Sequence, residues 1–401
     1  MSRNRFRRVR NKRRRRRLSS HNWWPFVLML GSVILALALC AGVAYYVLPK
    51  AADMLGFNYH APFLPKASPP PTPVPTPTPH PITYYEMAEH TQEVVFDGSA
   101  NYKWFTDPYF YGGKLILSAG KLDAADNSIH MLHLYFYDPA TSSAEALPFA
   151  PQNTHFMFPK FNDKWLVYLD ANANGGGALM AVDRAASPLK PVKIKDIYAG
   201  QPEPMLDGNY VAFTDRTGTN RDKLFICDLT TMESTVVAMF SNAVYGESRP
   251  SLWSNWLLWA SPDTSGGGED SSVISYIHLA GSPTISSYLP GGFVHDPKTG
   301  GKYTAWLTDV HSGGSQLYAT RGISGTPFLI DSGVVDFGIG SDFVAYSRGQ
   351  SIYLYLFETS GIYRITQDYE SAQFLGVSDD RVIWMDVTSR ERDIIKFIAI
   401  P

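Results

Sequence analysis

Leu115-Ile116-Leu117 is the first of seven apolar triplets that decide the fold of this 401-residue chain. The others are Leu166-Val167-Tyr168, Val211-Ala212-Phe213, Leu257-Leu258-Trp259, Thr304-Ala305-Trp306, Val344-Ala345-Tyr346 and Val382-Ile383-Trp384. Their central residues are spaced by 51, 45, 46, 47, 40 and 38 positions. A period of about 40 to 50 residues, with several short strands in each unit, is typical of a β-propeller. The triplets predict an all-β, seven-bladed β-propeller.

Two further features repeat with the triplets. In six of the seven, the third residue is aromatic, as blades that pack face to face require. In the first five units a proline stands eight positions before the central residue, and in the last two units Phe337 and Leu375 take its place. The prolines are Pro108, Pro159, Pro204, Pro250 and Pro297.

The last unit lacks a fourth strand, because the chain ends at Pro401 soon after the predicted strand Ile394–Ile400. An unpaired edge of this kind promotes aggregation. Upstream of the first unit, residues Gln92 to Phe96 form a strand-like segment with no blade of its own. We expect this N-terminal strand, around Glu93 to Phe96, to complete the seventh blade and close the ring.

The N-terminal region predicts a membrane anchor. The first seventeen residues carry eleven Arg and Lys and no acid, and a dense apolar run extends from Phe26 to Leu48. Such a run is long enough to cross a bilayer, and basic residues beside a membrane helix stay on the cytoplasmic side. We expect a cytoplasmic tail (1–22) in contact with anionic lipid and a single-pass signal anchor (23–49). The alternative for the arginines is a nucleic-acid arm.

A proline-rich stalk is expected next, at residues 50–89, because half of the residues between Pro62 and Pro81 are proline. Proline excludes helix and sheet and favours extended polyproline II. The propeller then occupies 90–401, outside the cytoplasm, in an extracellular or periplasmic position. Beyond the first seventeen residues, 24 basic residues stand against 37 acidic ones, a net charge of −13 that argues against nucleic acid as a partner. Cys227 is expected to be a buried thiol without a disulfide partner.

A family resemblance is carried by Thr214-Asp215-Arg216-Thr217-Gly218-Thr219-Asn220-Arg221-Asp222-Lys223-Leu224-Phe225. This stretch is similar to the repeat of TolB-like (WD-repeat-like) propellers: an aromatic strand, Ser/Thr-Asp-Arg, a Gly/Asn-rich turn, then Asp and an apolar strand. Asp386 to Ile395 is a second similar copy, and Asp309 to Tyr318 a looser third. The resemblance implies the fold and a tendency to bind or scaffold, and it implies no substrate.

The sequence holds no familiar catalytic set. It has neither a Gly-x-Ser-x-Gly nucleophile elbow nor a His-Glu-x-x-His zinc motif, and His130 and His133 would lie on opposite faces of a strand. Asp170, Asn172 and Asn174 match the opening of a calcium loop, but Ala178 and Ala181 stand where later ligands are needed. A flexible Asn/Gly turn explains the same residues. No cofactor is expected, with calcium as the weak alternative.

The candidate ligand site comes from the position of charged residues at the first strands, which line the central channel of a propeller. Those residues are Asp107, Glu203, Arg249, Asp296 and Asp336. Together they suit a cation or a basic peptide group at the channel mouth. The alternative is that they cap turns and pair with neighbours.

These patterns favour a membrane-anchored binding or scaffolding module for a protein, peptide or glycan at a bacterial cell envelope. The alternative is a carbohydrate-active enzyme, a hydrolase or lyase, that uses the channel carboxylates. A sensor is less favoured, because the cytoplasmic tail is too short for a folded output domain.

Overall fold

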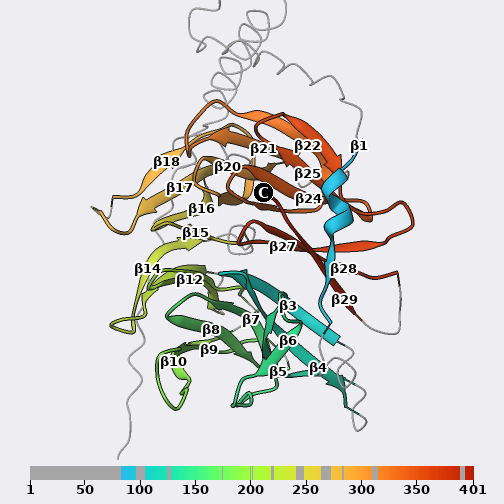
Figure 1. Cartoon of the computed structure of the whole chain (residues 1–401). Helices are drawn as coiled ribbons and strands as arrows, with labels where there is room; N and C mark the ends of the chain where they lie inside the picture. The colour runs from blue at the N-terminus through green and yellow to red at the C-terminus, as the bar shows by residue number, and fades with distance from the viewer. Residues whose placement is uncertain are drawn as a thin grey trace, which may run out of the picture. The chain divides into compact units, whose positions relative to one another are not determined.

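Each of the seven apolar triplets lies in the second strand of a sheet whose remaining strands pair around it (Figure 1). The computed structural model describes residues 83–95, 104–123, 128–173, 175–198, 200, 202–217, 221–240, 248–262, 272–281, 284–308, 315–388 and 393–401. The predicted membrane anchor and most of the stalk lie outside these residues. Within the described part, no helix is both long enough and apolar enough to span a bilayer.

The strands group into seven blades in chain order. Blade one holds β3 (Trp104–Tyr111), β4 (Lys114–Leu122), β5 (Ile129–Asp138) and β6 (Ser143–Ala146); blade two holds β7 (His155–Phe161), β8 (Trp165–Ala171), β9 (Gly177–Asp183) and β10 (Val192–Ile197). Blade three holds β11 (Met205–Asp207), β12 (Tyr210–Thr217), β13 (Arg221–Asp228) and β14 (Glu233–Phe240); blade four holds β15 (Ser251–Trp253), β16 (Trp256–Pro262), β17 (Ser272–His278) and β18 (Ser286–Tyr288). Blade five holds β19 (Val294–Thr299), β20 (Tyr303–Thr308), β21 (Ser315–Arg321) and β22 (Phe328–Val334); blade six holds β23 (Asp336–Ile339), β24 (Phe343–Arg348), β25 (Ser351–Leu356) and β26 (Gly361–Arg364). Blade seven holds β27 (Ala372–Ser378), β28 (Arg381–Asp386) and β29 (Ile394–Ala399).

The blades form a closed ring. The first strands contact one another in the circular order β3, β7, β11, β15, β19, β23 and β27, and β27 contacts β3 again. Figure 1 shows the last blade beside the first one. The seven-bladed propeller predicted from the triplet period is therefore confirmed.

The N-terminal segment completes the seventh blade, as predicted. Strand β2 (Gln92–Glu93) runs antiparallel to β29, with Gln92 opposite Phe397 and Glu93 opposite Lys396. The Val94 N–H then donates to the Ile395 carbonyl at 2.9 Å. Phe96, the end of the predicted closing strand, lies outside the described residues.

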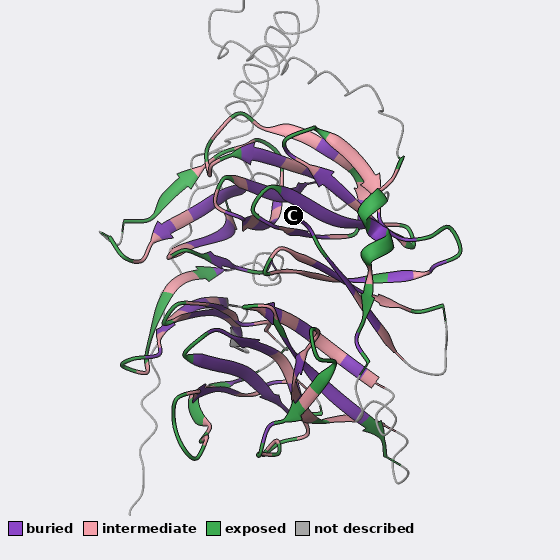
Figure 2. Ribbon diagram, viewed as in Figure 1, coloured by how far each residue is buried: buried purple, intermediate pink, exposed green. Residues whose placement is uncertain are grey.

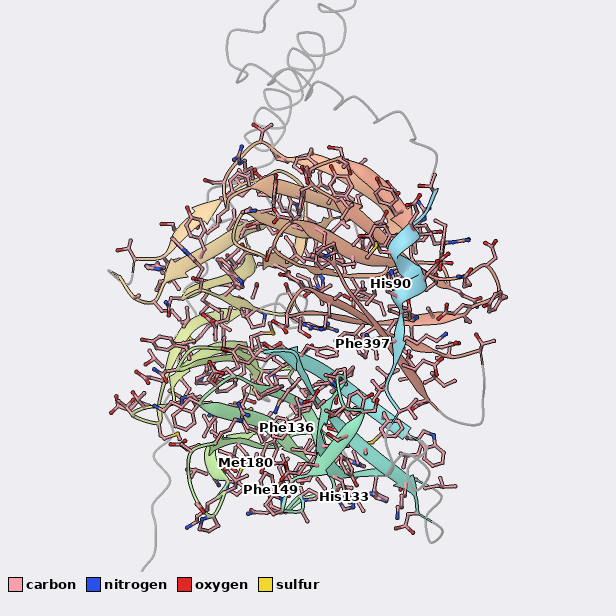
Figure 3. The ribbon with its side chains drawn as sticks, viewed as in Figure 1. His90, His133, Phe136, Phe149, Met180 and Phe397 are labelled. Atoms are coloured by element: carbon pink, nitrogen blue, oxygen red, sulfur yellow. The ribbon has the colours of Figure 1, made fainter. Side chains whose placement is uncertain are left out.

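The structure places the start of the propeller earlier in the chain than the sequence predicts. Residues 83–89, which we assigned to the stalk, belong to the ring: β1 (Thr83–Tyr84) adds a parallel strand to β26 of blade six. The 3₁₀ helix η2 (Glu86–His90) follows, and its Ala88 packs in the core with Ile398 and Ile400. His90 of η2 and Phe397 of β29 mark this junction in Figure 3. The N-terminal segment thus covers the outer edges of two adjacent blades.

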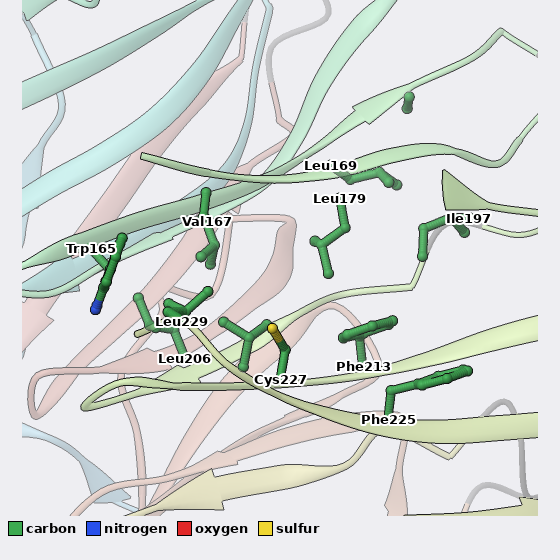
Figure 4. Close-up of a cluster of buried hydrophobic side chains, with 13 residues drawn as sticks. Trp165, Val167, Leu169, Leu179, Ile197, Leu206, Phe213, Phe225, Cys227 and Leu229 are labelled. Carbon is green, nitrogen blue, oxygen red and sulfur yellow. The ribbon is translucent and has the colours of Figure 1, made fainter. Parts of the chain in front are cut away.

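The core lies between the blades, on the second and third strands (Figure 2). The predicted aromatic residues are all buried there: Tyr168, Phe213, Trp259, Trp306, Tyr346 and Trp384. Figure 4 shows the cluster between blades two and three, where Val167 and Leu169 of β8 meet Phe213 of β12 and Cys227 of β13. Cys227 is buried, as expected from its apolar strand. Each fully buried large apolar side chain stabilises such a core by about 1.5–3 kcal/mol.

A second set of contacts joins the blades at one end of the ring. It consists of the hairpin turns between first and second strands, at residues 112–113, 162–164, 208–209, 254–255, 300–302, 340–342 and 379–380, which we call the turn belt. With neighbouring strand residues it makes a contact at each of the seven blade boundaries. These are Tyr111–Asp163, Asn162–Gly208, Asp207–Asn255, Trp253–Gly301, Lys302–Asp342, Ser341–Asp380 and Asp379–Gly113.

Candidate functional site

A cavity of about 600 Å³ extends along the first strands of all seven blades, from the turn belt to charged residues that include Glu203, Arg249 and Asp336. One residue from each blade shows its reach: Tyr109, Lys160, Met205, Ser251, Lys298, Gly338 and Gly376. The cavity is therefore the central channel of the propeller, and the turn belt surrounds one end of it.

Five charged side chains form a connected set on the cavity wall, which we call the channel network. Lys160 Nζ lies 2.6 Å from Glu203 Oε1, and Arg249 lies 3.6 Å from Glu203 Oε2. Arg249 lies 3.7 Å from Asp336 Oδ2, and Lys298 Nζ lies 3.6 Å from Asp336 Oδ1. Each of the two carboxylates is thus held between two cations.

Three of the five predicted site residues, Glu203, Arg249 and Asp336, belong to this network and line the cavity. Asp107 and Asp296 do not line it. Asp107 Oδ2 accepts the Phe158 N–H at 3.0 Å, and Asp296 Oδ1 accepts the Arg249 N–H at 2.6 Å. For these two residues the turn-capping alternative describes their contacts.

A backbone feature separates the two groups. In blades one, two and five the first strand bulges at its proline, and the residue before the proline has a positive φ: 53° at Asp107, 52° at Phe158 and 47° at Asp296. Proline has no N–H to pair, so a bulge is a position where a strand tolerates it. In these three blades the residue after the proline lines the cavity: Tyr109, Lys160 and Lys298. In blades three, four and six the first strand pairs without a bulge. In those blades the residue before the proline position lines the cavity: Glu203, Arg249 and Asp336.

Sequence reasoning missed Lys160 and Lys298. Each directly follows its proline, at the bulge that interrupts the alternation of its strand. The Pro-Lys pairs at matching places in blades two and five were the available signal. Their addition changes the expected chemistry, because three cations now face two carboxylates. Both carboxylates of the network have cations as neighbours, whereas the sequence led us to expect a site for a cation or a basic group.

The surroundings of three carboxyls near the channel, Glu203, Asp296 and Asp107, shift their pKa values in different directions. Burial raises the pKa of Glu203, but Lys160 and Arg249 outweigh this effect and bring it to about 2. Burial likewise raises the pKa of Asp296, and His295 and Lys298 overcome it to give about 2. Burial dominates at Asp107 and raises its pKa to about 6, although the Phe158 N–H partly opposes this. Glu203 thus stays ionised near neutral pH.

The candidate calcium loop forms a turn. Asp170 is buried, and its two oxygens accept the N–H groups of Gln152 and Asn153 at 2.8 and 2.9 Å. The Asn172 N–H donates to the Gly176 carbonyl at 3.1 Å, and Asn174 lies outside the described residues. Among the residues that the structure describes, no three His, Cys, Asp or Glu gather closely enough to hold a metal ion.

The motif that resembles TolB-type repeats has a structural role where its residues are described. Asp215 Oδ1 accepts the Tyr198 N–H at 3.1 Å, which ties β12 to the segment that enters blade three. Asp393, from the second copy, accepts the Phe105 N–H of blade one at 3.1 Å. Most of the third copy, residues 309–314, lies outside the described part. The motif aspartates therefore fix the chain between blades.

No family model matches the sequence, and no curated protein matches it. Solved structures do match. The β-propeller domain of the Trilobed protease from Pyrococcus furiosus, whose topology is described as open velcro, is 14% identical, with a TM-score of 0.55 over 74% of this chain and 93% of that one. Pyrococcus horikoshii acylaminoacyl peptidase is 11% identical, with a TM-score of 0.55 over 74% of this chain. This chain covers 51% of that peptidase's length. TolB from Acinetobacter baumannii is 11% identical, with a TM-score of 0.38 over 72% of this chain and 78% of that one. The seven blades and the similarity to the propellers of the protease and the peptidase establish a seven-bladed β-propeller, and at these identities they establish the fold alone.

Proposed function

We propose that this chain is a binding module whose ligand enters the central cavity from the turn belt. The observation that carries the proposal is the cavity of about 600 Å³ lined by all seven blades, with the channel network at one end. Pockets of this size, with apolar walls and a few placed charges, are typical ligand sites. Glu203 and Asp336 are each held between two cations, which suits electrostatic recognition better than the proton transfers of a glycoside hydrolase.

The setting of this module is also a proposal. The basic tail and the apolar run of residues 26–48 support a single-pass anchor in a bacterial cell membrane, with the tail against anionic lipid in the cytoplasm. The proline-rich segment supports a stalk that holds the propeller outside the cytoplasm. The ligand would then be a protein, peptide or glycan of the cell envelope.

Blocking the cavity tests the proposal. Lys164 lies exposed in the turn belt and borders the cavity, whereas Lys193 lies exposed on β10, the outer strand of the same blade. Full-length Lys164→Cys and Lys193→Cys proteins, each also carrying Cys40→Ser and purified in mild detergent, are coupled to a maleimide polyethylene glycol, which the buried Cys227 does not react with. Both are then screened against envelope peptides and glycans.

We expect the coupled Lys164→Cys protein to lose the ligands that wild-type protein retains, and the coupled Lys193→Cys protein to keep them. Retention of every ligand by the coupled Lys164→Cys protein would overturn the central cavity as the site.

A further inference from the structure

Arg249 has hydrogen-bonding capacity that the described part of the protein does not use. A guanidinium carries five N–H donors. The side-chain interactions of Arg249 are two ion pairs, at 3.6 Å to Glu203 and 3.7 Å to Asp336, and both exceed hydrogen-bonding distance. Its side chain is 46% exposed and borders the cavity. The two carboxylates therefore balance its charge without occupying its donors.

The other two cations of the channel network are already committed. Lys160 bonds Glu203 at 2.6 Å and lies 4.8 Å from the centre of the Tyr109 ring. Lys298 donates to the Phe337 carbonyl and lies 4.4 Å from the centre of the Phe337 ring. Arg249 is thus the network cation best able to receive a new acceptor, and its planar fork matches a carboxylate.

The side chains of the cavity wall determine which chemical groups the rest of the ligand can carry. The polar side chains of the wall are largely engaged between blades: Asn162 bonds Gly208, Ser341 bonds Asp380 and Ser378 accepts the Phe110 N–H. Few remain to bind the many hydroxyls of a sugar. Met205, Leu252 and Ile339 supply apolar surface instead. The wall therefore suits a carboxylate attached to an apolar group.

The opening of the cavity limits the number of negative charges. Four aspartates border it at the turn belt, Asp163, Asp207, Asp379 and Asp380. Two cations stand against them: Lys164, which also borders the cavity, and Arg381, which pairs with Asp379 at 2.6 Å, so the excess charge is still negative. A polymer with a carboxylate on every unit would meet like charge there, whereas a chain with a single terminal carboxylate would not. This difference favours a peptide C-terminus over an acidic polysaccharide.

We propose that Arg249 binds the C-terminal carboxylate of a peptide whose last side chain is apolar and lies against the cavity wall. The proposal rests on the proposed function, since it places its ligand in the same cavity. It differs from the expectation of a cationic ligand, because it places an anion at Arg249.

The test uses two pools of fluorescein-labelled hexapeptides that end in Leu or Phe, one with a free C-terminal carboxylate and one with a C-terminal amide. Binding to full-length protein is measured by fluorescence anisotropy. We expect the acid pool to bind at least tenfold more tightly than the amide pool. Arg249→Gln should abolish this difference, and Arg321→Gln, which removes the same charge from an exposed position on β21, should keep it.

A second variant, Asp336→Asn, distinguishes a lost binding contact from a fold damaged by the Arg249 substitution. Asparagine keeps the Oδ1 atom that accepts the Phe337 N–H at 2.7 Å and removes one competing charge from Arg249. It should tighten binding of the acid pool, a gain that a damaged fold would not produce. Equal binding of acid and amide pools to wild-type protein, or a preference that survives Arg249→Gln, would overturn the inference and leave the binding cavity standing. Absence of binding by both pools would overturn the inference as well, and only the blocking experiment then decides the proposed function.

Discussion

At the scale of single residues, Asp107 makes stability depend on pH in an unusual direction. Its pKa is raised by burial to about 6 in the fold, above the ordinary aspartate value of 3.8, so the folded state binds the proton more tightly than the unfolded state. Its contribution to stability is present below about pH 4 and is lost as the pH rises to about 6. Glu203 and Asp296 have lowered pKa values, so their contributions to stability are present above about pH 4.5 and are lost as the pH falls toward about 2.

Asp107→Asn should therefore change the free energy of unfolding differently at the two pH values. The free energy of the variant minus that of wild type should be about 1–3 kcal/mol more favourable at pH 7 than at pH 4. Asparagine keeps an oxygen for the Phe158 N–H and carries no charge to bury. Urea unfolding at pH 4, 5, 6 and 7 measures the difference. Parallel pH profiles of the two proteins between pH 4 and 7 would contradict the assignment.

Lys160 carries a second prediction at this scale. Its side chain is 9% exposed and bonds Glu203, so Lys160→Met leaves a largely buried carboxylate with Arg249 alone. We expect a loss of about 2–4 kcal/mol in the free energy of unfolding. The double variant Lys160→Met/Glu203→Gln should recover most of it. Lys193→Met, at an exposed pair with Asp196, should cost less than about 1 kcal/mol, and an equal loss at both lysines would contradict this account.

The sequence could predict three of the five residues of the channel network. The other two, Lys160 and Lys298, line the cavity because their strands bulge at the preceding proline. Glu203, Arg249 and Asp336 line the cavity because their strands pair without a bulge. Aspartate tolerates the positive φ seen at Asp107 and Asp296 better than glutamate or arginine does, but Phe158 adopts it too. Residue type therefore could not identify the bulged blades in advance.

At the scale of elements, the short strand β2 has an effect beyond its length. Its antiparallel pairing with β29 covers the last blade, and Val94 extends the pairing by one hydrogen bond to Ile395. The sequence predicted this closure because the seventh unit lacked a strand and Gln92–Phe96 lacked a blade. It did not predict the parallel pairing of β1 with β26, since two residues beside a proline-rich segment carry no strand pattern.

Val94→Pro tests the closing strand. Proline removes the N–H that bonds the Ile395 carbonyl, and Val94 itself is buried. We expect the variant to lose about 2–3 kcal/mol of unfolding free energy and to aggregate more readily, because the edge of β29 is uncovered. Val95→Pro is the control, since Val95 is half exposed. Equal melting temperatures and monodispersity for Val94→Pro and wild type would contradict the closure.

At the scale of the whole molecule, the sequence predicted the ring of seven blades but not the turn-belt contacts that join neighbouring blades. The triplet period and buried aromatics follow from strand alternation, which is local. The turn belt depends on contacts between residues about 40 to 50 positions apart, such as Asp207 with Asn255 and Lys302 with Asp342. Such pairs involve ordinary turn residues, so no local pattern marks them.

The proposed membrane topology belongs to the same scale. A reporter fused after Pro401 should be active only outside the cytoplasm, and one fused before residue 18 only inside it, because eleven basic residues precede the apolar run. Full-length protein should remain in the membrane fraction. Release of a shorter mature form, cut near Cys40, would contradict the anchor.

The N-terminal segment that joins blades six and seven also determines how the ring responds to mechanical force. A pull applied through residues before Thr83 acts first on the two residue pairs of β1, then on η2, and then on the short pairing of β2 with β29. These contacts are few, so they should rupture before any four-stranded blade unfolds. Single-molecule pulling from the N-terminus should show a first step shorter than about 45 Å, because the distance that residues 83–95 already span in the fold is subtracted from their extended length. The N-terminal segment should therefore detach first under force, and its detachment uncovers the outer edges of blades six and seven while the remaining strands of the blades stay folded.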